Sequence, residues 1–226
     1  MPGWLRDIWG FILARPDAST LYKASTREER EDLAQRIQQR LGIDVTTYSI
    51  LNVHRIGIAV PGRDVFARLL DWDGDSSYWP NHLARATRVD ASLDNIDIRL
   101  FGWRRFLGFR LIPLFRLSAV RIQCDPAANE TDNARYVMFT CDGGYPIGHF
   151  IMYVRSSIEA LGESGPTQVF LAVGFNVYGR RRLARTGPAR LVTAGWEVLH
   201  NRVTSHVLCR LKELCENDLK ERAAGR

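Results

Sequence analysis

The sequence predicts an α+β fold in which a curved antiparallel sheet of about seven strands wraps around one long C-terminal helix. Residues 188–222 carry apolar side chains at helical spacing, with polar side chains between them. The chain before this helix shows period-two patterns that are typical of strands. About thirty helical residues span roughly 45 Å, so the helix must lie across something broader than one strand.

The C-terminal helix is the element that the pattern defines best. Pro188 suits a helix start, where the missing N–H has no intrahelical partner. Gly195 costs about 1 kcal/mol relative to Ala and indicates a bend. The apolar stripe comprises Trp196, Leu199, Val203, Val207, Leu211 and Leu214, widened by Leu208, Cys215 and Leu219.

The composition excludes several functional classes. The chain has 226 residues, of which 46% are hydrophobic, enough for a sizeable core. Its net charge of +6 comes almost entirely from arginine, which we attribute to the codon bias of a GC-rich bacterial genome. No nucleic-acid motif accompanies it, and the densest basic run is Arg180–Arg182. We therefore expect no nucleic-acid partner.

The location follows from two further absences in the sequence. No uncharged apolar run is long enough to span a membrane, and the N-terminus lacks the features of a signal peptide. We therefore predict a cytoplasmic protein, with peripheral membrane contact as an open extension.

Neither a metal nor a cofactor is expected. Cys124, Cys141, Cys209 and Cys215 form no CxxC pair, and a cytosolic setting favours buried thiols. His200 and His206 are six residues apart, so they do not share a helix face as a metal pair would. The known nucleophile and phosphate-binding motifs are also absent.

Residues 1–47 form a predicted helical appendage. One helix covers residues 3–13, with Trp4, Leu5, Ile8, Trp9 and Ile12 near one face. It either packs on its own domain or a partner subunit, or lies in a membrane interface. A second helix covers residues 25–41, capped by Ser25 with Glu28 or by Thr26 with Glu29.

The main domain begins at residue 48 and extends to residue 226. Two short helical segments are expected at 63–70 and near 82–83. A tight turn near residues 93–95 joins two of the strands. The predicted strands cover residues 49–60, 86–92, 95–102, 118–124, 135–141, 148–155 and 168–178.

Residues 101–117 alternate aromatic and aliphatic side chains with four arginines. Such a segment covers a cavity, or meets lipid headgroups with arginine and acyl chains with phenylalanine. With the N-terminal tryptophans, it supplies the predicted contacts to an anionic membrane: Trp4, Trp9, Trp103, Arg104, Arg105, Phe106, Phe109 and Arg110.

The strand-to-helix segment 54–66, with Leu69, Leu70 and Asp71, carries a resemblance to a known superfamily. It resembles the first strand, turn and helix of the START-like helix-grip (SRPBCC) proteins, and Tyr78-Trp79-Pro80 resembles the segment after their second helix. That superfamily includes polyketide cyclases, birch-pollen-allergen relatives and lipid-transfer domains. The likeness covers about residues 48–220; the appendage and the long 101–117 segment depart from it.

The resemblance implies a deep apolar cavity between the sheet and the long helix. His54 is the best candidate for polar chemistry, either as a hydrogen-bonded core histidine or as a group that faces the ligand. Alternation along the strands does not fix which face the most apolar ones present. The candidate lining residues are His54, Met138, Phe139, Phe150, Met152, Phe175, Asn176, Trp196 and Leu199.

Three functions remain open at this point. The first is a carrier or transfer module that binds a lipid-like or polyketide-like molecule and touches a membrane. The second is a cyclase- or dehydratase-like enzyme acting on a carbonyl compound, which needs His54 or a tyrosine such as Tyr136, Tyr153 or Tyr178 in the cavity. The third is a scaffold whose N-terminal helices form a homodimer or dock a partner.

Overall fold

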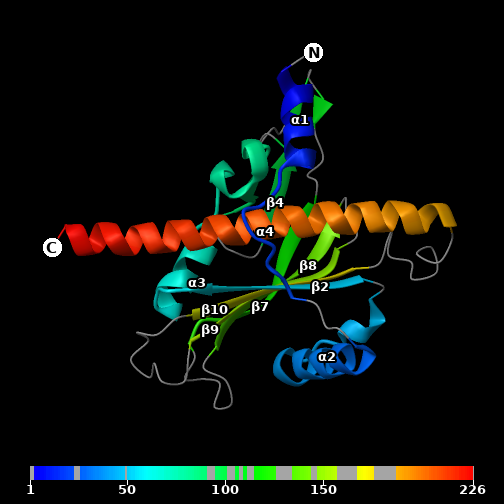
Figure 1. The fold of residues 1–226 in the computed structure, drawn as a ribbon, viewed down its shortest axis with the longest axis horizontal. Coiled ribbons are helices and arrows are strands. Elements are labelled where there is room, and N and C mark those ends of the chain that lie inside the picture. Colours follow the sequence, from blue (N-terminus) through cyan, green and yellow to red (C-terminus); the bar gives the residue numbers. More distant parts are fainter. Residues whose placement is uncertain are drawn as a thin grey trace.

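The computed structural model describes residues 3–22, 26–48, 50–90, 95–100, 105–106, 109–110, 115–125, 134–143, 147–156, 167–175 and 187–225. Figure 1 shows the long helix α4 (Gly187–Ala224) lying across one face of a curved sheet, with both helix ends projecting past the strands. The predicted α+β architecture is therefore confirmed.

The described strands of the main sheet have the order β1-β2-β10-β9-β8-β7-β4-β3, and every neighbouring pair is antiparallel. The eighth strand, beyond the seven expected, is the two-residue β1, which pairs with Val53 and His54 in the middle of the chain's first long strand. Their bounds are β1 Leu21–Tyr22, β2 Ile50–Ile58, β3 Ala84–Arg88, β4 Asn95–Leu100, β7 Phe115–Gln123, β8 Ala134–Gly143, β9 Ile147–Arg155 and β10 Thr167–Phe175.

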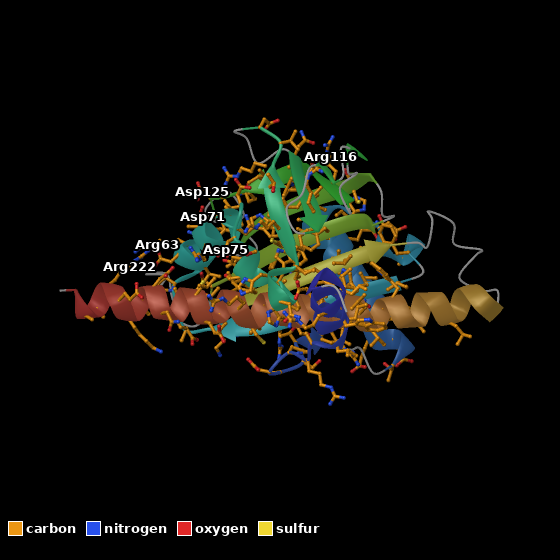
Figure 2. All side chains as sticks on the ribbon, turned by 90° about the horizontal axis from the view of Figure 1, so that it is seen from above. Arg63, Asp71, Asp75, Arg116, Asp125 and Arg222 are labelled. Carbon is orange, nitrogen blue, oxygen red and sulfur yellow. The ribbon has the colours of Figure 1, made fainter. Side chains whose placement is uncertain are left out.

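A cluster of charged side chains lies near the C-terminal end of α4. Figure 2 shows Arg63, Asp71, Asp75 and Arg222 together near the C-terminal end of α4, whereas α1 (Gly3–Leu13) crosses near its middle. Arg68 lies within 4.0 Å of three carboxylates in this cluster, those of Asp71, Asp75 and Asp218. Ion pairs therefore lie near the C-terminal end of α4, whereas apolar side chains lie between its middle and the sheet.

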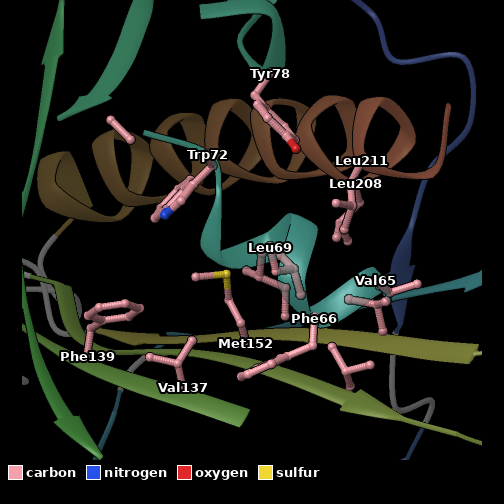
Figure 3. Packing of buried hydrophobic residues seen from close by; sticks show 14 of the residues in the cluster. Val65, Phe66, Leu69, Trp72, Tyr78, Val137, Phe139, Met152, Leu208 and Leu211 are labelled. Atoms are coloured by element: carbon pink, nitrogen blue, oxygen red, sulfur yellow. The ribbon is translucent and has the colours of Figure 1, made fainter. Parts of the chain in front are cut away.

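The core on the concave face is built around α3 (Gly62–Leu70), which matches the expected helix at 63–70. Figure 3 shows Val65, Phe66 and Leu69 of α3 between the strands and the part of α4 that carries Leu208 and Leu211. Val65, Leu208 and Leu211 are at most 1% exposed. Their burial fixes the second half of α4 against the sheet.

The convex face is covered by α2 (Arg27–Leu41), whose N-terminus has the Thr26–Glu29 capping box, one of the two predicted frames. Ala34 and Leu41 of α2 pack with side chains of β2, β8, β9 and β10 in a second core cluster. The ring of Tyr48 covers Gly148 and Gly174, where an added Cβ would overlap it. Both sheet faces are therefore buried over the central strands.

Residues 3–22 reach the other side of the sheet. Asn81 Nδ2 donates a hydrogen bond to Asp7 O in α1 at 3.5 Å, and Arg202 of α4 donates one to Ile12 O at 3.5 Å. The N-terminal segment that was expected to be an appendage thus lies against the rest of its own chain: α2 packs on the convex face of the sheet, and α1 contacts η3 and α4.

Several predicted features differ or fall outside the described residues. The strand expected at 86–92 is β3, which starts two residues earlier and ends at Arg88. The 93–95 turn, the end of the 168–178 strand and most of segment 101–117 lie outside the described residues. Within that segment, β5 (Arg105–Phe106) pairs with β6 (Phe109–Arg110). Short 3-10 turns cover Val45–Thr47 (η1), Ser76–Tyr78 (η2) and Pro80–His82 (η3).

Candidate functional site

A cavity of about 280 Å³ lies between α4, α1 and the concave face of the sheet. The sheet contributes Ala84, Ile98, Leu117, Phe150 and Leu171, and α1 contributes Ile8, Phe11 and Ile12. Helix α4 contributes Trp196, Leu199, His200, Val203, Thr204 and Val207, and the connections around α3 and η3 contribute Trp72, Trp79 and Leu83. Apolar side chains form nearly the whole wall, as in sites that bind small hydrophobic molecules.

The apolar stripe of α4 lies in two different environments along its length. From Trp196 to Val207, residues three and four apart face the cavity. From Leu208 to Cys215, the stripe is buried against the core around α3. The cavity therefore lies along the part of α4 that precedes its contacts with α3.

Helix α1 closes this space from the other side of α4. Its residues Ile8, Phe11 and Ile12 face the cavity, whereas Trp9 is 50% exposed and Leu13 is 65% exposed. Gly10 lies against Asn81, and an added Cβ there would overlap the Asn81 side chain. The first helix thus forms part of the cavity wall in its own chain.

Two polar side chains, His200 and Thr204, lie in the described wall of the cavity. They are one helical turn apart, with His200 Nδ1 3.4 Å from Thr204 Oγ1. Burial lowers the pKa of His200 from 6.5 to about 4, and the nearby His54 lowers it further. The imidazole is therefore neutral at pH 7, with one ring nitrogen that donates and one that accepts.

His54 lies behind this wall rather than in it. It is fully buried on β2, opposite Leu171 of β10, which does line the cavity. Its Nδ1 is 3.0 Å from Thr20 Oγ1, and its Nε2 is 3.2 Å from Asn201 Oδ1. Burial lowers the pKa of His54 to about 4, although the hydrogen bond to Asn201 acts in the opposite direction.

The His54 hydrogen bonds belong to a chain that joins three elements. Thr20 Oγ1 also lies 3.1 Å from Ser205 Oγ, and the Thr20 N–H donates to the same oxygen at 3.2 Å. This chain ties the segment after α1 to β2 and to α4. Of the two roles that the sequence left open for His54, the structure shows the hydrogen-bonded core histidine.

The other predicted lining residues are distributed over both faces of the sheet. Phe150, Trp196 and Leu199 line the cavity. Phe139 is fully buried in the concave core, and Met152 borders a small adjoining space of about 20 Å³. Met138 packs on the convex face with the α2 cluster. The Phe175 side chain and Asn176 lie outside the described part of the structure.

The tyrosines considered for carbonyl binding do not line the cavity where they are described. Tyr136 and Tyr153 stack on each other in the convex cluster, with ring centroids 6.3 Å apart. Tyr178 is outside the described residues. The imidazole and hydroxyl groups of the described wall instead come from α4, and Trp72, Trp79 and Trp196 add indole N–H donors.

Sequence reasoning did not identify the contribution of α1, Trp72, Trp79, Leu83, His200 and Thr204 to the cavity. His200 and Thr204 share the face of Trp196 and Val203 at helical spacing, so extending the apolar stripe to polar residues would have found them. Ile8 and Phe11 come from about 190 residues earlier in the chain, and no local pattern connects them to α4.

Of the predicted membrane contacts, only Trp9 has a described side chain. The backbones of Arg105, Phe106, Phe109 and Arg110 form the short β5–β6 ladder. The side chain of Trp4, and residues Trp103 and Arg104, lie outside the description.

The described ranges contain neither a membrane-spanning helix nor a metal-binding cluster. None of the helices there is long and apolar enough to cross a membrane. The same residues contain no cluster of three or more His, Cys, Asp or Glu side chains placed to hold a metal ion.

Neither a protein-family model nor any curated protein sequence matches this chain. Among solved structures, the aromatase/cyclase Zhui from a Streptomyces species has 14% identity and a TM-score of 0.48, over 75% of this chain and 95% of that one. A Polyketide_cyc-like protein from Corynebacterium glutamicum has 14% identity and a TM-score of 0.43, over 76% and 94% of the two chains. A START superfamily protein from Mycobacterium smegmatis has 10% identity and a TM-score of 0.41, over 73% and 98%.

These likenesses concern the arrangement of helices and strands. The described elements of this chain form a curved antiparallel sheet, a short helix after the first long strand, and a long final helix across the concave face. The chain therefore has the helix-grip fold that its sequence predicted.

Proposed function

We propose that this protein binds a hydrophobic small molecule in the cavity between α1, α4 and the sheet. The observation that supports this function is the wall itself: about 280 Å³ lined largely by aromatic and aliphatic side chains from elements far apart in sequence. A ligand there gains about 25 cal/mol for each Å² of apolar surface removed from water. An empty apolar space of this kind costs folding stability that a ligand restores.

Binding can be measured with N-phenylnaphthylamine, an uncharged dye whose fluorescence rises in apolar surroundings. We expect saturable binding of one dye per chain, with quenching of tryptophan emission because Trp72, Trp79 and Trp196 line the cavity. Native mass spectrometry of the freshly purified protein should also show a co-purified molecule. Absence of both the dye signal and any adduct would contradict the proposal.

A carrier function with peripheral membrane contact is favoured by the outer side of α1. The helix that closes the cavity with Ile8, Phe11 and Ile12 presents Trp9 and Leu13 to solvent. On α4, Leu191 and Val198 are also exposed. A helix with apolar side chains on both sides can exchange cavity contacts for contacts in a lipid interface. Such an exchange would open the cavity at the membrane surface.

The double substitution Trp9→Ser and Leu13→Ser should weaken binding to anionic phosphatidylglycerol vesicles by about tenfold or more, because two large apolar side chains no longer enter the interface. Co-sedimentation at low salt measures this, and added salt should weaken binding by the unsubstituted protein. Val120→Ser is the control, since Val120 is exposed on β7 and does not line the cavity. A protein that ignores such vesicles is no membrane carrier, although the cavity proposal would stand.

A further inference from the structure

We infer that the molecule bound in the cavity is uncharged and carries a carbonyl or hydroxyl oxygen that hydrogen-bonds to His200 and Thr204. This inference rests on the proposed ligand-binding function and specifies the chemical class of the ligand. Three observations support it: the described wall lacks charged residues, His200 and Thr204 lie in this wall, and a hydrogen-bond chain through His54 fixes the rotation of α4.

The described wall contains no arginine, lysine, aspartate or glutamate. A charged group moved from water into such a wall has no opposite charge to meet, and its burial is strongly unfavourable. The charged side chains of α3 and the end of α4 form ion pairs elsewhere, such as Arg222 with Asp64 at 3.7 Å. A carboxylate ligand would therefore lack a partner in the described cavity.

His200 and Thr204 are the side chains of the described wall that can both donate and accept hydrogen bonds, whereas the indole groups of its tryptophans only donate. His200 and Thr204 occupy consecutive turns of α4, between Trp196 and Val207, and both line the cavity. His200 Nδ1 and Thr204 Oγ1 are hydrogen-bonded to each other at 3.4 Å, so a ligand oxygen beside one of these groups is also within reach of the other. A neutral imidazole donates to a carbonyl or accepts from a hydroxyl, and the threonine hydroxyl does either.

Hydrogen bonds on the side of α4 that faces β2 fix the position of His200 and Thr204. Asn201 and Ser205, each the next residue along α4, take part in the hydrogen-bond chain with His54 and Thr20. Three of these residues, Thr20, His54 and Ser205, are at least 93% buried. Because this chain fixes the rotation of α4 over β2, it directs His200 and Thr204 to the cavity side of the helix.

Burial also keeps the site neutral. The pKa values of His54 and His200 are both lowered to about 4, so neither ring carries a charge near pH 7. The surroundings therefore favour a ligand that has a polar but uncharged group over one with a formal charge. The rest of the ligand should be hydrocarbon, to match the apolar wall.

The test compares three molecules with one naphthalene body: acetylnaphthalene, isopropylnaphthalene and naphthoate, each competing with N-phenylnaphthylamine at neutral pH. We expect His200→Leu and Thr204→Val each to weaken acetylnaphthalene binding by about three- to tenfold, the size of one hydrogen bond. Isopropylnaphthalene binding should change by less than about twofold, because it offers no acceptor. Naphthoate should bind unsubstituted protein more weakly than acetylnaphthalene.

His206→Leu is the matched control, because His206 is a half-buried histidine of the same helix that is not part of the cavity wall. It should leave all three affinities unchanged. The isosteric Thr204→Val keeps the test decisive if His200→Leu disturbs folding. The inference is overturned if the ketone is bound equally well by the variants, or if naphthoate binds as tightly as the ketone. Protein that binds neither the dye nor any of the three molecules contradicts the proposed function, and this inference with it.

Discussion

Ala84→Phe should abolish most ligand binding, lowering the affinity for N-phenylnaphthylamine by at least about tenfold, while the protein stays folded. Ala84 is 1% exposed on β3, and its side chain lines the cavity. A phenyl ring added there enters a space of about 280 Å³ instead of a packed core. Overpacking, which ordinarily costs about 1–3 kcal/mol, is therefore avoided, and the ring occupies the volume of the ligand.

The control for this substitution is Arg85→Phe on the same strand. Arg85 is exposed, and neighbouring residues of a strand point to opposite faces of the sheet. The same ring is thus added outside the cavity, and dye binding should remain unchanged. If Ala84→Phe binds the dye as tightly as the unsubstituted protein, the dye binds elsewhere. Thermal unfolding of both variants shows whether either is misfolded.

Acidification from about pH 7 to about pH 5 should lower the free energy of unfolding by about 2 kcal/mol through His54 alone. Its folded-state pKa is about 4, below the ordinary 6.5, because burial disfavours the charged ring. Between these two values the unfolded chain binds a proton that the folded protein does not. The stabilisation is therefore complete above about pH 6.5 and is lost as the pH falls toward 4.

Urea unfolding at several pH values measures this slope. The His54→Gln variant should show a clearly smaller loss of stability over the same range, since glutamine does not titrate and can still hydrogen-bond. Part of the slope should remain, because burial also lowers the pKa values of His149, His200 and His206. His82→Gln, at an exposed histidine, serves as the control. An unchanged slope in His54→Gln would show that His54 is not buried in its neutral form.

The elements that the sequence predicted best are those whose signals are local. The capping box at Thr26, the turn of residues 61–62 into α3 and the long stripe of α4 each lie within one element. Capping and helical spacing depend on residues three or four apart, so they can be identified without knowledge of the fold.

The cavity lining could not be assigned in the same way, because the central strands are buried on both faces. Met138 and Phe139 are both buried, but Met138 packs with α2 and Phe139 packs in the concave core. Alternation identifies a face only when one side of the sheet is polar. Here α2 removes that contrast by covering the convex face.

The role of His54 could not be assigned from the sequence either. The sequence shows only that His54 lies on the apolar face of its strand, with Ile56 and Ile58. Whether such a histidine faces a ligand depends on its hydrogen-bond partners, and these come from Thr20 and Asn201. The two partners lie 34 and 147 residues away. Long-range pairing of this kind is fixed only by the folded chain.

The central claim is that α1, α4 and the sheet enclose a space that takes an apolar molecule. A crystal structure of the protein grown with bromonaphthalene tests this most directly, because the anomalous signal of bromine locates the ligand without reference to the protein coordinates. We predict one strong signal between Phe150 of β9, Trp196 of α4 and Ile8 of α1. A signal only on the outer surface, or side chains of the protein filling that space, would contradict the account.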